Sequence, residues 1–230
     1  MKILKKIYYK KYSKTSYSIS GVDLIIDRIF SKIRDGVYID LGCNHPIKYN
    51  NTYILHKRGW KGINIDSDSK SIEEFKKLRK KDHNVHELVS SKKNKIKYYF
   101  YHERSALNTV DPYLVKKRKA KPKKIINLET KTLNSIIENS PYNKSKINLL
   151  SVDIENHEYE ALKNFKFNKY KIDCIIIELI NTKSKKIETQ NQNLEFIFKS
   201  KIYKLLTKNK YKLINWVNSD LIFFHKNSKI

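Results

Sequence analysis

Acidic residues stand at the ends of several short apolar runs in this sequence, where a parallel sheet would bring them together. Each run is rich in β-branched or aromatic side chains, which is typical of a buried strand. Because the carboxyl ends of parallel strands meet at one edge of a sheet, we expect these acids to face one crevice. They are Asp40, Asp66 and Asp153, which close residues 37–39, 62–65 and 148–152.

Residues 37–66 indicate a strand, a turn, a helix and a second strand, the nucleotide-binding half of a parallel α/β sheet. Gly42 would let the main chain pass close to a ligand, and Asp66 could accept both hydroxyls of a ribose. The turn is not G-x-G-x-x-G, because Asn44 and Pro46 stand near the places of the later glycines. This pattern argues against a pyrophosphate site and favours a ligand with a ribose and no phosphates, such as S-adenosylmethionine (SAM).

The methionine part of such a ligand needs partners for its two charged groups. Peptide N–H groups of the turn can face its carboxylate, and we predict that Asn44 and Thr52 help to hold it. Asp40 and Asp153 are predicted to face its amino group, directly or through water. Thr52 has a second interpretation, as the cap of a helix over residues 53–57.

The third predicted strand, over residues 85–89, carries Glu87 and Leu88 where folds of this kind usually meet an adenine ring. We predict that both residues contact the cofactor. The alternative for Glu87 is a carboxylate at a strand end that faces only solvent.

The segment from Asp153 to His157 is predicted to carry the chemistry. In an extended conformation Asp153, Glu155 and His157 would all point into the crevice. The pKa of a histidine suits a general base, and Glu155 is an equal candidate; His45 is a third, although a loop histidine is more often structural. Asp153 and Glu155 could also bind a divalent cation such as magnesium, but two acids do not establish a site, and we assign no metal ligands.

These segments resemble the FkbM family of SAM-dependent methyltransferases, in the branch with His-Pro in the first loop. The resemblance covers roughly residues 35–225, with Asn156 at a position where the family usually has glycine. It implies a class I Rossmann-like α/β fold, with a mostly parallel seven-stranded sheet and an antiparallel C-terminal hairpin. The further matching blocks are Ala106–Thr109, Thr132–Asn134, Leu150–Glu155 and a strand that ends near Glu178.

The resemblance also implies a function, which is transfer of a methyl group from SAM to an oxygen. The expected acceptor is a small molecule or glycan, through a sugar hydroxyl or a hydroxyl of a secondary metabolite. The alternative is an RNA 2′-O-methyltransferase, for which Asp153 and Glu178 could supply the acids of a Lys-Asp-Lys-Glu set. The lysines of that set cannot be placed in this sequence.

The rest of the chain is expected to form one methyltransferase domain over residues 21–230, after a basic N-terminal segment, residues 1–20. Periodic apolar residues predict helices, one of them with Ile72, Phe75 and Leu78 facing inward. The predicted helices span residues 22–33, 69–81, 128–139, 158–164 and 194–206. The remaining predicted strands span residues 95–101, 172–180, 211–217 and 221–225, and residues 181–192 are predicted to form a polar linker.

Composition bounds the class of protein. The formal charge of +26, from 49 Lys and Arg against 23 Asp and Glu, would suit nucleic acid or another polyanion, but coding DNA rich in A and T also favours lysine. Cys43 and Cys174 lie beside or inside predicted core strands, which favours buried thiols in a reducing compartment. No Cys/His cluster supports zinc, and no apolar run has the length of a membrane span, so we expect a cytoplasmic protein.

If the charge is compositional, RNA binding should be weak and should fall steeply as salt rises, because it would come from phosphate contacts and counterion release. Filter binding between about 50 and 200 mM salt would measure this dependence. Tight binding that requires a cap or a sequence near physiological salt would contradict the expectation and favour the RNA methyltransferase.

Overall fold

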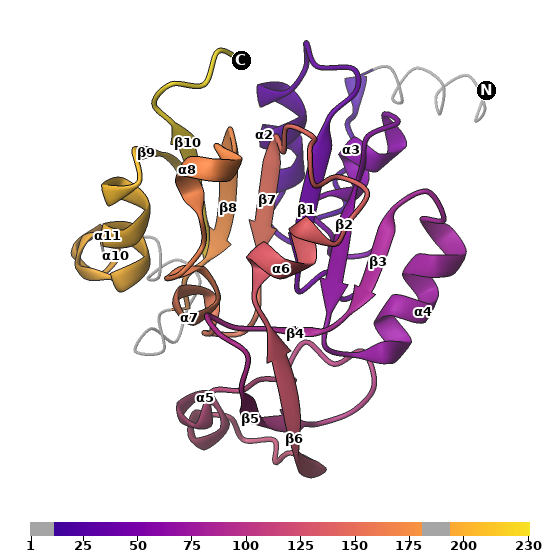
Figure 1. Cartoon of the computed structure of the whole chain (residues 1–230), viewed down its shortest axis with the longest axis vertical. Coiled ribbons are helices and arrows are strands. Elements are labelled where there is room, and N and C mark those ends of the chain that lie inside the picture. Colours follow the sequence, from indigo (N-terminus) through magenta and orange to yellow (C-terminus); the bar gives the residue numbers. More distant parts are fainter. Residues whose placement is uncertain (1–11, 181–193) are drawn as a thin grey trace.

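A seven-stranded sheet forms the centre of the protein in the computed structural model, which describes residues 12–180 and 194–230 (Figure 1). Its strands are β1 (Val37–Leu41), β2 (Lys61–Asp66), β3 (His83–His86), β7 (Leu149–Val152), β8 (Cys174–Glu178), β9 (Tyr211–Val217) and β10 (Asp220–His225). The order is β3-β2-β1-β7-β8-β10-β9, and all neighbouring pairs from β3 to β8 are parallel. Because β10 runs antiparallel to both β8 and β9, the predicted fold with its C-terminal hairpin is confirmed.

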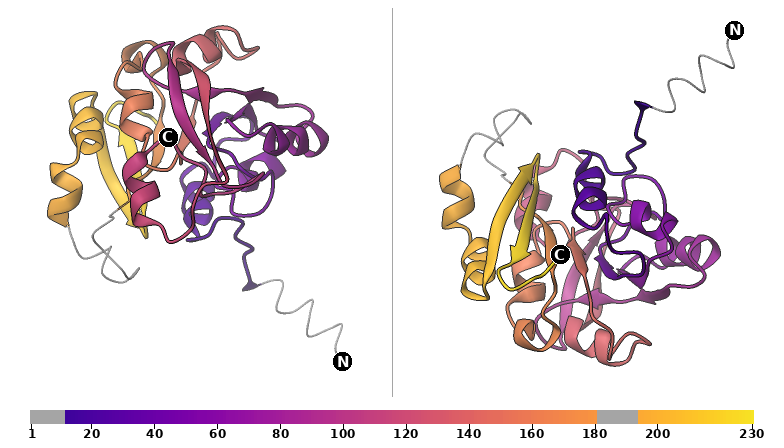
Figure 2. Two further views of the ribbon diagram at one scale, coloured as in Figure 1. Left: turned by 90° about the horizontal axis from the view of Figure 1, so that it is seen from below. Right: turned by 90° about the horizontal axis from the view of Figure 1, so that it is seen from above.

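Helices cover both faces of this sheet, because successive residues of a strand point to opposite sides (Figure 2). They are α2 (Val22–Ile29), α3 (Tyr53–Lys57), α4 (Ser69–Leu78), α6 (Leu133–Glu138), α7 (Glu158–Leu162), α8 (Phe167–Tyr170), α10 (Leu194–Lys199) and α11 (Lys201–Lys208). Tyr38 of β1 packs with α2 and α3, whereas its neighbour Ile39 packs in the cluster that contains α6, α7 and α11. No helix among the described residues has the length and apolar character to cross a bilayer.

A second, three-stranded sheet lies beyond the carboxyl ends of the central strands, at the bottom of Figure 1. It consists of β4 (Leu88–Val89), β6 (Lys124–Lys131) and β5 (Lys95–Phe100), in that order. β6 pairs parallel with β4 and antiparallel with β5, and α5 (Pro112–Lys117) lies in the connection between β5 and β6. The small sheet therefore stands over the edge at which the central strands end.

The strand β6 shows that the helix predicted over residues 128–139 was wrong in its first part. Residues 128–131 belong to β6, because they find partners in β4 and β5 that the local sequence does not reveal. Only Leu133–Glu138 form a helix. Thr132 separates the two elements, since its hydroxyl accepts a hydrogen bond from the backbone N–H of Ser135 at 3.1 Å and caps the helix.

Two other predicted elements are divided in the structure. The strand over residues 85–89 breaks at Glu87, with one part in the central sheet and the other in the small sheet. The helix over residues 194–206 breaks at Ser200, whose hydroxyl caps α11 and starts a new helix. In both cases the hydrophobic pattern runs on across the break, so it does not reveal where the first element ends and the second begins.

Helix boundaries also differ from the prediction. The helix predicted over residues 22–33 ends at Ile29. Leu78 is 55% exposed rather than inward, because α4 ends at this residue. The predicted linker over residues 181–192 lies outside the described residues.

The end of the basic N-terminal segment is attached to the domain through Asp23, a buried residue of α2. The carboxylate of Asp23 accepts hydrogen bonds from the hydroxyl of Ser16 at 2.6 Å, the N–H of Tyr17 at 2.7 Å and the hydroxyl of Ser18 at 2.9 Å. These bonds fix the path of the chain into the first helix.

The side chain of Arg79, which follows α4, is only 1% exposed and holds the loop between β1 and α3. Its guanidinium donates to the carbonyl of Pro46 at 2.9 Å, the amide oxygen of Asn50 at 2.7 Å and the hydroxyl of Thr52 at 2.8 Å. Asp40 in turn accepts hydrogen bonds from Asn50 at 2.9 Å and Thr52 at 2.7 Å. The buried carboxylate thus balances the buried guanidinium through two shared partners.

Replacing Arg79 with methionine should lower the free energy of unfolding by about 3–5 kcal/mol, because it leaves buried carboxylates without their counter-charge. Urea unfolding of Arg79→Met would measure the loss. Lys80→Met is the matched control, since Lys80 is exposed and its replacement should change stability by less than about 0.5 kcal/mol. A loss of less than about 1 kcal/mol for Arg79→Met would show that the network does not hold the loop.

Candidate functional site

A cavity of about 620 Å³ opens at the carboxyl ends of β1, β2 and β7, next to the small sheet. Its volume lies in the usual range for sites that bind small molecules. Most of the residues predicted for the site line this cavity, whereas Asp40 and Thr52 do not. Those that line it are Gly42, Asn44, His45, Asp66, Glu87, Leu88, Asp153, Glu155 and His157.

Gly42 brings the end of β1 against the end of β7. Its φ is 82°, and a Cβ at this position would lie 1.8 Å from the carbonyl oxygen of Asp153. The N–H of Asp153 also donates to the carbonyl of Leu41 at 3.0 Å. The glycine is therefore required by the approach of two main chains, whereas its predicted closeness to a ligand stays a prediction.

Asp66 ends β2 and faces the cavity with a preorganised carboxylate. One oxygen accepts the N–H of Asn44 and the other the N–H of Asp68, both at 2.8 Å. Each oxygen keeps a lone pair for a further donor. Burial raises the pKa of Asp66 to about 6, although the two backbone hydrogen bonds oppose the shift.

Asp40 and Thr52 support the first loop from below the cavity. The hydroxyl of Thr52 is fully buried between Arg79 and Asp40, and it makes no hydrogen bond to the start of α3. Thr52 therefore stands at the N-cap position of α3, as the second interpretation expects, but its side chain does not cap the helix. Asp40 is 4% exposed, and both of its side-chain partners belong to the loop. From their positions we assign both residues to the support of the loop rather than to contact with a ligand.

Glu87 and Leu88 line the cavity at the start of β4. The N–H of Glu87 donates to the carbonyl of Asp66 at 3.0 Å, so the pair lies beside the acid at the end of β2. The carboxylate of Glu87 forms an ion pair with Lys131 at the end of β6. An apolar and a polar side chain thus border the same end of the cavity.

The turn over residues 153–157 is not extended as predicted, because Glu155 and Asn156 both have positive φ, 57° and 73°. Asparagine tolerates this left-handed conformation better than most residues, so it can occupy the place where the family usually has glycine. Glu158 fixes the turn by accepting the N–H groups of Ile154 at 2.9 Å and Asn156 at 3.3 Å. Burial raises the pKa of Glu158 to about 8.

The two histidines predicted as candidate bases differ in their surroundings. His157 lines the cavity with its Nε2 at 3.2 Å from the hydroxyl of Ser90, and burial lowers its pKa. Its imidazole is therefore neutral near pH 7 and able to accept a proton. His45 uses Nδ1 to accept the N–H groups of Ile47 and Lys48, at 3.1 and 3.0 Å, which is a structural role in the loop.

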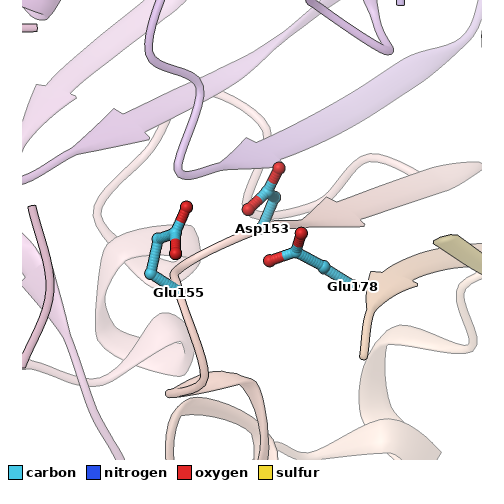
Figure 3. Close-up of side chains that lie close together, drawn as sticks. All are labelled: Asp153, Glu155 and Glu178. Atoms are coloured by element: carbon cyan, nitrogen blue, oxygen red, sulfur yellow. The ribbon is translucent and has the colours of Figure 1, made fainter. Parts of the chain in front are cut away.

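Three carboxylates converge at the ends of β7 and β8, as Figure 3 shows for Asp153, Glu155 and Glu178. One oxygen from each lies within 4.8 Å of the others. Arg118 forms an ion pair with Glu155. Burial raises the pKa of all three carboxyls, and repulsion between their negative charges adds to the shift at Asp153 and Glu178.

Residues that were not predicted for the site connect it to the small sheet. Arg118 donates to the carbonyl of Leu107 at 2.5 Å as well as pairing with Glu155, and Thr109 donates to the carbonyl of Glu155 at 2.9 Å. Arg118 stands in a run of lysines, so nothing in the sequence distinguishes it. Glu178 has the same signal as the predicted acids, because it ends a buried strand.

Comparison with known proteins shows which family the chain belongs to. A family model described as the methyltransferase FkbM domain matches residues 40–211, which is most of the chain. No curated protein matches the sequence significantly. Among solved structures, a TehB-like SAM-dependent methyltransferase from Corynebacterium glutamicum has a TM-score of 0.44 and 12% identity, over 98% of this chain and 97% of that one. From the family match, this chain belongs to the FkbM methyltransferase family and is a SAM-dependent methyltransferase.

Proposed function

We propose that this protein is an O-methyltransferase that acts on a hydroxyl of a sugar, in a glycan or in a secondary metabolite. The observation that carries the proposal is one cavity lined both by a ribose-type acid, Asp66, and by a neutral histidine, His157. The acceptor oxygen attacks the methyl carbon, so that an O–C bond forms while the C–S bond breaks. The electrons of that bond leave with sulfur as a thioether, and the hydroxyl proton passes to a base.

In this proposal the cofactor occupies the part of the cavity between Asp66 and Asp153. Asp66 accepts the ribose hydroxyls through the free lone pairs of its oxygens, with Asn44 beside it. Leu88 and Glu87 border the adenine. Asp153 faces the amino group of the methionine part, because it follows β7 where the first loop approaches.

His157 is the base that the geometry favours. Its imidazole is neutral and faces the cavity, whereas Glu155 is already paired with Arg118. Ser90 can hold the imidazole through Nε2, which leaves Nδ1 to accept the proton. The buried thiols Cys43 and Cys174 suit a reducing compartment, so we place the reaction in the cytoplasm.

A second candidate function is 2′-O-methylation of RNA, because Arg118, in the lysine-rich run over residues 116–124, pairs with Glu155 of the cavity lining. Against it, no lysine of the described residues forms an ion pair with Asp153 or Glu178. Methyl transfer from labelled SAM to a panel of sugars, glycans and capped RNA separates the candidates. We expect a methyl ether on a sugar, and a labelled ribose in RNA would instead support the second candidate.

Replacing His157 with asparagine should lower turnover about 10²–10⁴-fold while SAM affinity stays nearly unchanged, because the residue is assigned to the proton and not to the cofactor. Turnover of the unchanged protein should rise with pH through the lowered pKa of His157, and this rise should be lost in the variant. His83→Asn is the control, since His83 lies in β3 away from the cavity. Full turnover in His157→Asn would move the role of base to Glu155.

Replacing Asp66 with alanine should weaken SAM binding about ten- to hundredfold, the effect of losing charged hydrogen bonds to the ribose. Because the ligand-free pKa of Asp66 is about 6, its carboxylate becomes protonated below that pH. SAM affinity should therefore fall about tenfold per pH unit below pH 6, and the variant should not show this fall. Calorimetry between pH 5 and pH 8 tests both effects, with Glu73→Ala on the exposed side of α4 as control. Equal affinity in Asp66→Ala would remove Asp66 from the cofactor site.

A further inference from the structure

The three carboxylates at the ends of β7 and β8 lie close together, and two of them, Asp153 and Glu155, line the cavity (Figure 3). Asp153 directly follows β7, Glu155 lies in the turn after it, and Glu178 is the last residue of β8. Because β7 and β8 are parallel neighbours, the two strand ends bring Asp153 and Glu178 side by side. One oxygen of each of the three side chains lies within 4.8 Å of the others.

Glu178 carries a second signal, which does not depend on the clustering of acids. Its Oε2 is buried and has no hydrogen-bond partner, while its Oε1 accepts only a long hydrogen bond from Ser219, at 3.3 Å. A buried carboxylate oxygen without a donor is unfavourable unless a cation or a proton occupies the place of the donor. In Figure 3 the carboxylate of Glu178 points towards Asp153, so the missing partner belongs between the acids.

The charges around the cluster are not balanced. Among the described residues, Arg118 is the one basic side chain that forms an ion pair with a member of the cluster, and it does so with Glu155. If all three carboxylates are ionised, the one guanidinium leaves the cluster with a net charge of −2. Each acid adds to the negative potential at the other two, so a cation between them is favoured. The further acids Asp40, Asp66, Glu158 and Asp220 lie near enough to act on them in the same direction.

We propose that Asp153, Glu155 and Glu178 bind one hard divalent cation of the magnesium or manganese class. Such ions prefer carboxylate oxygens in octahedral geometry at about 2.1 Å, which places neighbouring ligand oxygens about 3.0 Å apart and opposite ones about 4.2 Å apart. The observed spacing needs only a small movement to reach these values. A divalent charge also balances the cluster when Arg118 remains in place, and one oxygen of Asp153 stays available for the cofactor.

The role of the cation rests on the proposed function, although its binding does not. Three ligands from the protein leave positions for water or for an acceptor oxygen, in a cavity that His157 also lines. A hydroxyl bound there has a lowered pKa and loses its proton more easily when the O–C bond forms. The cation would thereby hold the acceptor, while Asp66 holds the cofactor.

The binding of Mn²⁺ to the full-length protein tests the proposal directly, by electron paramagnetic resonance or calorimetry near pH 7.5. We expect one Mn²⁺ per chain, displaced by excess Mg²⁺, and binding at least tenfold weaker in Glu178→Gln. Asp153→Asn should weaken it in the same way and serves as a second variant if Glu178→Gln does not fold. Glu129→Gln is the control, since Glu129 is an exposed acid of β6 paired only with Lys95, and its affinity for Mn²⁺ should be unchanged.

Absence of Mn²⁺ binding at millimolar concentration, or equal affinity in Glu178→Gln and the unchanged protein, would overturn the proposal. The acids would then share protons, and their common titration would appear without any metal affinity. Binding of S-adenosylhomocysteine, the demethylated cofactor, is measured in the same samples. Mn²⁺ binding without methyl transfer to a hydroxyl would refute the proposed function but support the cation site. Methyl transfer to a hydroxyl without Mn²⁺ binding would support the proposed function but refute the cation site.

Discussion

The buried guanidinium of Arg79 is the interaction on which the cofactor side of the site depends. It bonds to three residues of the loop between β1 and α3, so the loop takes its shape from the interior of the protein. Asp40 balances its charge through Asn50 and Thr52. On the other side, Tyr38 contacts the guanidinium at 3.3 Å and donates to Asp82. A loop held in this way is preorganised, so less conformational entropy is lost when a ligand binds.

The charge at the carboxyl ends of the central strands is opposite in sign to the net charge of the chain. The chain carries a formal charge of +26, yet acids gather at the strand ends, and loss of solvation raises the pKa of Asp66, Asp153 and Glu178. The surface therefore attracts anions while the cavity favours cations. SAM carries positive charge on its sulfonium and amino groups, and it loses the sulfonium charge on methyl transfer. The negative potential of the acids therefore favours binding of SAM more than binding of its demethylated product.

The sequence predicted the central sheet and most of the cavity lining, because acids at the ends of apolar strands follow directly from the parallel fold. The prediction was wrong where contacts with residues far away in the sequence determine the local structure. Residues 128–131 were predicted as the start of a helix, but pairing with β5 and β4 makes them a strand. Arg79 and Arg118 stand among lysines, and no local signal separates a buried arginine from a solvated one. Thr52 was assigned to a ligand or a helix cap, since its position between Asp40 and Arg79 requires the folded loop.

The contact at Gly42 sets the spacing of the whole site. The carbonyl oxygen of Asp153 occupies the place where any other residue would carry its Cβ, so two main chains touch with no side chain between them. The distance from the loop that bears Asn44 to the acids after β7 is therefore a property of the backbone. Side chains on either side can be exchanged for others without altering that distance. Substitutions that reshape the lining of the cavity would thus leave the two loops at the same separation.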